Sequence, residues 1–250
     1  MIRINTHEKE LRFGIVSDTH LCAETERLEE LTEAYHIFKR EGINRVFHAG
    51  DITDGFNVYR GHENHIKCFG TDKQAEYTIH NYPKIDGIDT FFITGNHDLK
   101  AYEKGGPDIG GLIVNGLTIG SDDEGVKQVK GRTDLHYLGR YLARIVWNNN
   151  KIDLIHPDYG FSYAVSYAPQ KYINELEPGT KPDVLVFGHL HRAFYMNYRN
   201  INLLMGGCFQ GQNDYLKRKG IQPVRAAWII EMSRDRKFRL DFKPTLLKFY

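Results

Sequence analysis

Short apolar runs that end at polar residues recur along the first three quarters of the chain. They occupy residues 13–16, 45–49, 90–94, 152–155 and 183–187. Each run is followed by a glycine or a polar side chain, which is typical of strands buried in a sheet. The pattern therefore predicts five strands, each followed by a polar loop.

Between the first two runs, residues 24–41 repeat apolar side chains every three or four positions, as an amphipathic helix does. These side chains are Leu28, Leu31, Tyr35 and Phe38. A strand, a helix and a strand in succession favour a partly parallel sheet. Residues 72–81 form a second, less periodic helix candidate, whereas residues 55–71 show no clear period.

The second half of the chain changes to patterns that are typical of antiparallel hairpins. Asn115 and Gly116 separate two apolar triplets within residues 112–119, and this pair is a strong two-residue turn signal. Residues 144–147 and 151–155 predict another hairpin around three asparagines. Further strands are expected at residues 201–205, 226–232 and 238–242. Parallel and antiparallel features together predict an α/β fold with a sandwich of mixed sheets.

Composition adds that the chain is an ordinary globular one, with 250 residues, 41% hydrophobic and 26% charged. No internal repeat, low-complexity tract or linker divides it, so residues 1–250 are expected to form a single domain. The chain has 33 Lys and Arg against 32 Asp and Glu, a net charge of +1. Such a balance gives no general attraction to polyanions, so a nucleic-acid substrate is neither demanded nor excluded.

The three cysteines, Cys22, Cys68 and Cys208, are far apart and lack the paired spacing of a zinc or redox site. We expect reduced thiols in a cytoplasmic protein. The first residues contain no apolar core of a secretion signal, and no apolar run approaches the roughly 18 residues that a membrane helix needs. We therefore expect no membrane association.

Five polar segments, each directly after a predicted strand, concentrate metal-ligand chemistry. They are Asp18-Thr19-His20, Gly50 to Asp54, Gly95 to Asp98, His156-Pro157 and Gly188 to His191. One such segment alone is weak, because a histidine at a strand end is more often a structural residue than a ligand. Open α/β sheets, however, bind ligands at the carboxyl ends of their strands, so the five together predict one shared site.

The donor types in these segments are imidazole, carboxylate and amide oxygen, without thiolate. This mixture suits Mn, Fe, Zn, Co or Ni better than Ca or a structural zinc site. Two cations about 3.5 to 4 Å apart need a shared anionic oxygen to offset their repulsion. An aspartate can bridge in this way, whereas a histidine cannot.

The order D-x-H, G-D-x-x-D, G-N-H-D, a later His and G-H-x-H resembles the signature of calcineurin-like metallophosphoesterases. The resemblance covers Asp18 to His191 and implies two mixed β-sheets flanked by helices. It also implies two divalent cations, with manganese as the expected metal. One cation would be bound by Asp18, His20, Asp51 and His191. The other would be bound by Asp51, Asn96, His156 and His189, so that Asp51 bridges.

The same resemblance implies that His97 gives a proton to the leaving-group oxygen, and an imidazole is well matched to that transfer near neutral pH. Asp54 would accept a hydrogen bond from His97 and hold its orientation. The alternative for Asp54 is an ordinary residue of a loop turn.

Two departures separate this chain from the protein Ser/Thr phosphatases of the superfamily. Gly55 stands where they have a phosphate-gripping Arg, and their G-N-H-E is G-N-H-D here. His156 is followed by Pro157 in place of the usual glycine, which stiffens that loop. Both differences from the phosphatases favour another substrate class.

Several other polar residues can be interpreted either as structural residues or as parts of the site. His48 lies inside a predicted strand and is expected to be a hydrogen-bonded core residue. Residues 59–65, with His62 and His65, form either an ordinary polar loop or a segment that overhangs the metals. The basic Lys217, Arg218, Lys219 and Arg225 follow the last ligands closely enough to bend back toward the site.

The sequence therefore predicts a metal-dependent phosphoric ester hydrolase with a phosphate ester as its partner. A phosphodiesterase, including a nuclease acting on DNA or RNA, is the first hypothesis. A small-nucleotide phosphodiesterase, a phosphomonoesterase and an inactive scaffold subunit are the alternatives, and the complete ligand set argues against the last. The oligomeric state is left open.

Overall fold

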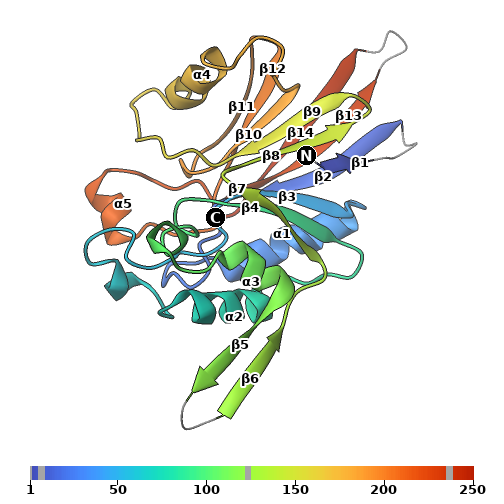
Figure 1. Cartoon of the computed structure of the whole chain (residues 1–250). Coiled ribbons are helices and arrows are strands. Elements are labelled where there is room, and N and C mark those ends of the chain that lie inside the picture. The colour runs from blue at the N-terminus through green and yellow to red at the C-terminus, as the bar shows by residue number, and fades with distance from the viewer. Residues whose placement is uncertain (1, 5–8, 122–124, 235–238) are drawn as a thin grey trace.

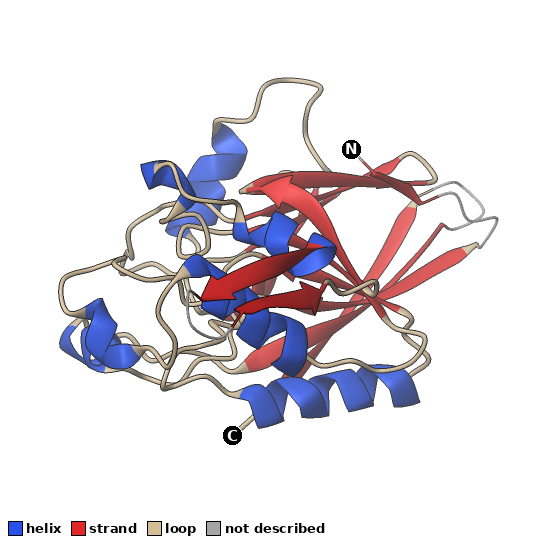
Figure 2. Cartoon of the chain, turned by 60° about the horizontal axis from the view of Figure 1, so that its bottom comes forward, coloured by secondary structure: helices blue, strands red, loops and turns tan. Residues whose placement is uncertain are grey.

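The computed structural model describes residues 2–4, 9–121, 125–234 and 239–250. Two six-stranded mixed sheets pack against each other, and helices cover their outer faces (Figures 1 and 2). This confirms the predicted α/β sandwich. The first sheet has the order β14 (Leu240–Lys248), β13 (Ala226–Arg234), β2 (Glu10–Val16), β3 (Arg45–Ala49), β4 (Asp89–Thr94), β7 (Leu135–Arg140). The second has the order β1 (Ile2–Ile4), β8 (Leu142–Trp147), β9 (Asn150–Ile155), β10 (Val184–Phe187), β12 (Ile201–Gly206), β11 (Ala193–Tyr198).

The directions of the strands bring several strand ends to common edges. In the first sheet β2, β3, β4 and β7 are parallel, and in the second β9, β10 and β12 are parallel. The β8–β9 and β13–β14 pairs are antiparallel, as the sequence predicts, although Phe238 lies outside the described residues. All five strands predicted from the apolar runs are present, as β2, β3, β4, β9 and β10.

Side chains along each strand point alternately to the two faces of its sheet, so the core consists of separate layers. Phe13 and Ile15 of β2 point into the core between the two sheets, whereas Val16 faces the helices. The outer face of the first sheet is covered by α1 (Leu28–Arg40), α2 (Thr71–Asn81) and α3 (Ile109–Asn115). The outer face of the second is covered by α4 (Tyr167–Asn174), whose Ile173 joins the cluster around Phe187. The remaining short helices are η1 (His62–His65), η2 (Tyr102–Lys104) and α5 (Asp214–Arg218).

The hairpin predicted within residues 112–119 is wrong. Its first half is the end of helix α3, which Asp108 caps by accepting a hydrogen bond from the Gly110 amide at 3.1 Å. Buried Ile113 packs this helix against the core. Gly116, with φ of 83°, ends the helix, and a glycine after the last turn is a common helix stop. A different hairpin follows, formed by β5 (Gly116–Ser121) and β6 (Gly125–Lys130).

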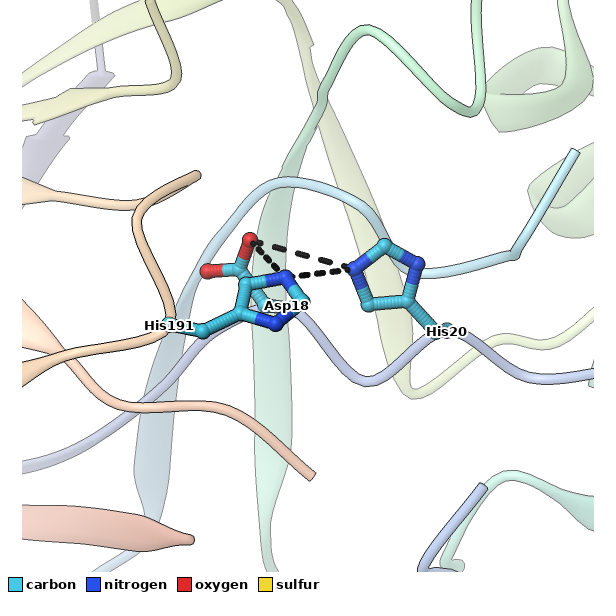
Figure 3. Close-up of side chains that lie close together, drawn as sticks. All are labelled: Asp18, His20 and His191. Atoms are coloured by element: carbon cyan, nitrogen blue, oxygen red, sulfur yellow. Dashed lines mark hydrogen bonds and ion pairs between the residues drawn. The ribbon is translucent and has the colours of Figure 1, made fainter. Parts of the chain in front are cut away.

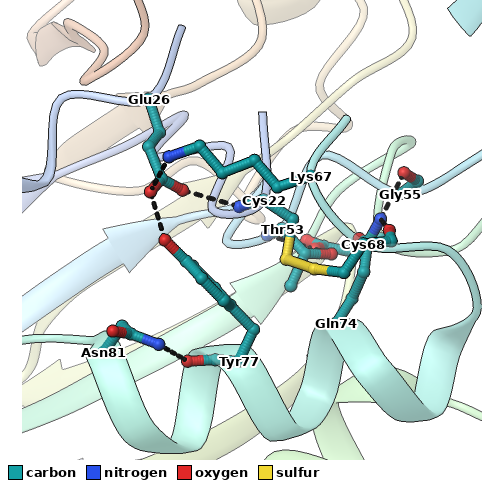
Figure 4. Close-up of a disulfide and its surroundings, with 10 residues drawn as sticks. Cys22, Glu26, Thr53, Gly55, Lys67, Cys68, Gln74, Tyr77 and Asn81 are labelled. Atoms are coloured by element: carbon teal, nitrogen blue, oxygen red, sulfur yellow. Dashed lines mark hydrogen bonds and ion pairs between the residues drawn. A yellow bond between two sulfur atoms is a disulfide. The ribbon is translucent and has the colours of Figure 1, made fainter. Parts of the chain in front are cut away.

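The expectation of three reduced cysteines is also wrong. Cys22 and Cys68 form a disulfide that joins the loop after β2 to the loop before α2 (Figure 4). Beside it, Glu26 accepts hydrogen bonds from the Cys22 amide at 2.7 Å and from Lys67 Nζ at 2.6 Å. Cys208 is free and buried. The disulfide removes the argument from cysteine usage for a reducing compartment.

Among the described residues, the helices are all too short or too polar to cross a lipid bilayer.

Candidate metal centre

The seven predicted ligands come together where the two sheets meet. Asp18 and His20 follow β2, Asp51 follows β3, and Asn96 follows β4. From the second sheet, His156 follows β9, and His189 and His191 follow β10. Parallel strands that end at the same edge thus supply donors from segments up to 173 residues apart in sequence, from Asp18 to His191.

The backbone at these positions is unusual, and nothing in the sequence signals it. Asp18, His20, Asp51, His189 and His191 all have φ between 46° and 78°. This left-handed region is uncommon for residues other than glycine and costs of order 1 to 3 kcal/mol for each residue. Pairing of the loops holds the conformation, since the Asp18 amide donates to Gly50 O at 2.9 Å and the His20 amide to Asp51 O at 3.1 Å. Such strain is typical of functional sites.

The first donor group consists of Asp18, His20 and His191 (Figure 3). Nε2 of His20 and Nε2 of His191 are 3.0 Å apart, and Nε2 of His191 is 3.5 Å from Asp18 Oδ1. All three side chains are buried. Donor atoms that converge in this way fit a divalent transition-metal ion.

The second donor group consists of Asp51, His156 and His189, with Asn96 beside it. Asn96 Oδ1 lies 3.2 Å from His156 Nε2 and 2.9 Å from His189 Nδ1. His189 uses its other nitrogen, Nε2, to donate to Tyr159 O at 2.9 Å. That bond fixes Nδ1 as the nitrogen that faces the group.

Asp51 connects the two groups. Its Oδ2 is 3.0 Å from His156 Nε2 and 3.7 Å from His20 Nε2, and its Oδ1 accepts a hydrogen bond from the His97 amide at 2.9 Å. Burial acts to raise the pKa of Asp51, but the neighbouring His156 and His97 outweigh it and hold the pKa well below its usual value. A buried, ionised carboxylate between two donor groups is the feature that a shared pair of cations requires.

Three glycines form a socket for the His156 ring. A Cβ at Gly95 or Gly188 would lie 2.6 to 2.7 Å from an atom of this imidazole, and a Cβ at Gly50 would lie closer still to its Nδ1. Nδ1 of His156 donates to Ala49 O at 2.7 Å, so Nε2 is directed at Asp51 and Asn96. The glycines that precede Asp51, Asn96 and His189 are therefore required by packing around His156.

Gly95→Ala is expected to lower stability by about 1 to 3 kcal/mol, the usual cost of overpacking, and to weaken metal binding. The new methyl would meet both Asp51 Oδ1 and the His156 ring. Thermal unfolding and metal titration measure the two effects. Gly120→Ala is the control, because a Cβ there meets nothing within 4 Å. Equal stability and equal metal affinity of the two variants would contradict the socket.

Asp54 accepts the expected hydrogen bond from His97, mainly through its backbone oxygen. Nδ1 of His97 donates to the backbone O of Asp54 at 2.7 Å and is 3.4 Å from its Oδ1. The carboxylate is engaged mainly with His20 Nδ1 at 2.8 Å and His62 Nε2 at 2.9 Å. Asp54 thus orients the predicted ligand His20 as well as His97. The alternative, that Asp54 is an ordinary residue of a loop turn, does not account for these bonds. His62 is fully buried, so it is more than part of a polar loop.

The surroundings of His97 favour its protonated form. Burial acts to lower the pKa of this imidazole, but the charges of Asp51 and Asp54 outweigh it and raise the pKa to about 9. His97 lines the cleft over the donor groups. A ring that holds a proton at the edge of such a cleft can serve as an acid.

Asp98 is a residue whose role the sequence does not reveal. Its carboxylate accepts hydrogen bonds from the amides of Ile52, Thr53 and Gly95 at 2.8 to 3.1 Å, and also from the Thr53 hydroxyl. Burial, followed by the charge of Asp51, raises the pKa of Asp98 to about 7. Asp98 thereby ties the loop of Asp51 to the loop of Asn96. Asp98 is the last residue of the G-N-H-D segment, where the sequence shows only a difference from G-N-H-E and does not indicate these hydrogen bonds.

A cleft of about 320 Å³ opens above the donor groups. Its walls include Tyr59 and Tyr215, whose rings stack at 5.1 Å, and Phe161 on the loop before α4. The Tyr59 hydroxyl is buried and has no hydrogen-bond partner among the described residues. The segment of residues 59–65 therefore contributes Tyr59 to the wall of the cleft.

The basic segment, residues 217–225, is expected from the sequence to bend back toward the metal site, and only the residues just before it reach the cleft. Tyr215 and Leu216 line the cleft, whereas Lys217 pairs with Asp214 at 3.4 Å. Arg225 is engaged with Glu30 at 2.9 Å. His48, as expected, is a fully buried core residue, hydrogen bonded to the Thr19 hydroxyl at 3.0 Å.

Sequence comparison connects this site with known proteins. A family model described as calcineurin-like phosphoesterase matches residues 11–193. The chain is similar to the DNA polymerase II small subunit of Halobacterium salinarum, with 21% identity over 91% of this chain and 49% of that protein. The protein of the same name from Methanothermobacter thermautotrophicus is 25% identical, over 87% of this chain and 52% of its own length. The chain spans about half the length of these curated relatives.

Solved structures with a similar fold include an archaeal phosphodiesterase, at 16% identity and a TM-score of 0.46, covering 95% of this chain and 100% of that one. Vps29 from Cryptosporidium parvum is 12% identical with a TM-score of 0.43, covering 97% of this chain and 100% of its own.

Proposed function

Because the chain belongs to the calcineurin-like phosphoesterase family, we propose that it is a hydrolase that cleaves phosphodiester bonds with two divalent cations. Manganese is the proposed metal. One cation would be held by Asp18, His20, Asp51 and His191. The other would be held by Asp51, Asn96, His156 and His189.

The observation that supports this proposal best is the convergence of all seven donors into two adjacent groups that share Asp51. When bound, the two cations would supply Lewis-acid activation of water and neutralise charge on the phosphate. The chain itself positions these donors. Asp54 fixes His20 through Nδ1, and Ala49 O fixes His156 through Nδ1, so that Nε2 of each ring remains for the metal.

His97 is the proposed acid for the leaving group. Its Nδ1 is held by the backbone O of Asp54, so Nε2 is the nitrogen that gives a proton to a departing oxygen. The backbone amide of the same residue holds Asp51 Oδ1 at 2.9 Å. One residue thus couples the position of the bridging carboxylate to that of the acid.

Diesters are the proposed substrates, and nucleic-acid strands are the first candidate among them. Gly55 has φ of 65°, and a Cβ there would collide with the carbonyl of His97. An arginine that grips a phosphomonoester cannot occupy this position without moving His97. The relatives named DNA polymerase II small subunit support a nucleic-acid context. Small nucleotides and phosphomonoesters are the alternative substrates.

Hydrolysis of bis-p-nitrophenyl phosphate with and without Mn²⁺ tests the proposal. Turnover should require metal and stop with EDTA. Elemental analysis of the active protein should give close to two transition-metal ions per chain. A sample with two bound ions and no turnover of any diester would contradict the proposed diesterase activity. At most one ion in a fully active sample would overturn the binuclear centre.

The relatives' name also supports a second candidate role, as a subunit of a larger nucleic-acid assembly. In that case metals would bind without catalysis, and the chain would act as a scaffold. Turnover of bis-p-nitrophenyl phosphate by the isolated chain with two ions bound distinguishes the two, because a scaffold gives none.

A further inference from the structure

A second hollow lies beside the metal cleft, and the mechanism above makes no use of it. It measures about 370 Å³ and is lined by loop residues Phe161, Ser162, Tyr163 and Val165, by Leu190 and Arg192, and by the turn around Lys219. Phe161 lines both this hollow and the metal cleft. Its ring stacks on that of His189 at 6.5 Å with an angle of 25° between the planes. The two depressions therefore lie on either side of one aromatic ring.

The loop that borders this second hollow exposes large apolar side chains. Four of the ten exposed large hydrophobic residues in the described part of the chain lie within residues 161–167. They are Phe161, Tyr163, Val165 and Tyr167. Tyr163 is fully exposed, at 104%. A soluble chain rarely concentrates such side chains on one loop without a binding role.

The charged residues that line the second hollow are both cations. Arg192 donates through Nη1 to Gln222 O at 3.0 Å, and Lys219 Nζ lies 5.9 Å from the centre of the Tyr215 ring. Within the described ranges, neither makes an ion pair with a carboxylate, unlike Lys217 and Arg225. The positive charge of the second hollow is therefore not neutralised locally.

Exposed aromatic rings beside unpaired cations fit one class of ligand. Single-stranded nucleic acid presents unstacked bases to aromatic faces and phosphates to cations, and each stacked base adds substantially to affinity. A duplex keeps its bases stacked and offers no such face. Because Phe161 lines both depressions, a strand with one phosphodiester over the donor groups would place neighbouring nucleotides in the second hollow.

We propose that the second hollow binds the nucleotides that flank the scissile phosphodiester of a single-stranded nucleic acid. The bases stack on Phe161 and Tyr163, and the phosphates contact Arg192 and Lys219. This inference rests on the proposed diesterase function and names its substrate class. It assigns phosphate binding to Lys219 within the basic segment and not to Lys217 or Arg225.

Binding of a fluorescein-labelled single-stranded oligonucleotide to the full chain, measured by anisotropy in EDTA so that no strand is cut, tests the proposal. Tyr163→Ala should raise Kd by about fivefold or more, the lower end of what one lost base stack costs. Tyr250→Ala is its control, because that tyrosine is also almost fully exposed, at 94%. Lys219→Gln should reduce the slope of log Kd against log salt by about 0.7, the value for one lost phosphate contact on a single strand. Lys130→Gln, an exposed lysine on the distant β5–β6 hairpin, is its control (Figure 1).

The proposal is overturned if Tyr163→Ala and Lys219→Gln bind like their controls, if a duplex binds as well as the single strand, or if the wild-type chain binds no strand. Hydrolysis of bis-p-nitrophenyl phosphate by the wild-type chain is measured in parallel. Suppose that the wild-type chain turns over that small diester and that the variants bind the strand like their controls. This result would contradict the binding role of the second hollow but not the proposed diesterase activity. Absence of turnover would sink the proposed diesterase, whereas the anisotropy result still decides the binding surface.

Discussion

Asp51→Ala is expected to abolish diester hydrolysis and to remove both cations together. Asp51 is the carboxylate shared by the two donor groups, at 3.0 Å from His156 Nε2 and 3.7 Å from His20 Nε2. Without it, each cation loses an anionic ligand, and nothing offsets the repulsion between the two ions. Activity on bis-p-nitrophenyl phosphate and metal content by elemental analysis are the measurements. Both should fall to background in the same sample.

Two comparisons make this result specific. Asp51→Asn keeps the shape of the side chain and the bond from the His97 amide but loses the charge, so it should also fail to hold two ions. Asp241→Ala removes an exposed carboxylate of β14 and should behave like the wild-type chain. Wild-type turnover by Asp51→Ala, with two ions bound, would contradict the assignment of the bridge.

The strands that carry the site could be predicted because their signal is local. Runs such as residues 13–16 and 184–187 contain no polar side chain whatever their tertiary neighbours, and a predicted ligand follows each run by two positions. Helix α3 could not be read in the same way, because Asn115-Gly116 is compatible with both a hairpin turn and a helix end. Burial of Ile113 and the cap by Asp108 decide between them, and both depend on the folded chain.

The disulfide escaped prediction for a related reason. Cys22 and Cys68 are 46 residues apart in sequence, and only the fold brings their Cα atoms to 5.9 Å. Their pairing depends on how the loop after β2 crosses the loop before α2. Cysteine spacing alone contains no information on that crossing.

At the site, the sequence identifies donor types and their order but not the supports around them. The left-handed backbone of Asp18 or His189, the glycine socket of His156 and three of the four bonds to Asp98 arise from contacts between different loops. The resemblance implies that Asp54 accepts a hydrogen bond from His97, but it does not reveal that the backbone oxygen is the nearer acceptor. Side-chain orientation within a loop is set by these contacts and cannot be read from residue types.

His97→Ala is expected to slow hydrolysis of diesters with poor leaving groups by about 10² to 10⁴, the usual contribution of general acid–base catalysis. Both cations should stay bound, because the backbone amide at position 97 still holds Asp51 Oδ1. With p-nitrophenolate, which leaves without a proton, the loss should shrink markedly. The measurement is kcat for a methyl or nucleoside leaving group compared with kcat for p-nitrophenolate, at equal metal content.

His62→Ala separates the acid role of His97 from a structural one. His62 contacts the same carboxylate of Asp54, at 2.9 Å, and lies 5.8 Å from His97 between ring centres. Its removal disturbs the Asp54 carboxylate, and with it the orientation of His20, whereas the backbone O of Asp54 still holds His97 Nδ1. Any loss in His62→Ala should therefore be the same for both leaving groups, whereas the loss in His97→Ala should depend on the leaving group. If the two variants respond alike, His97 acts only by positioning its neighbours, and the proton must come from another group in the cleft.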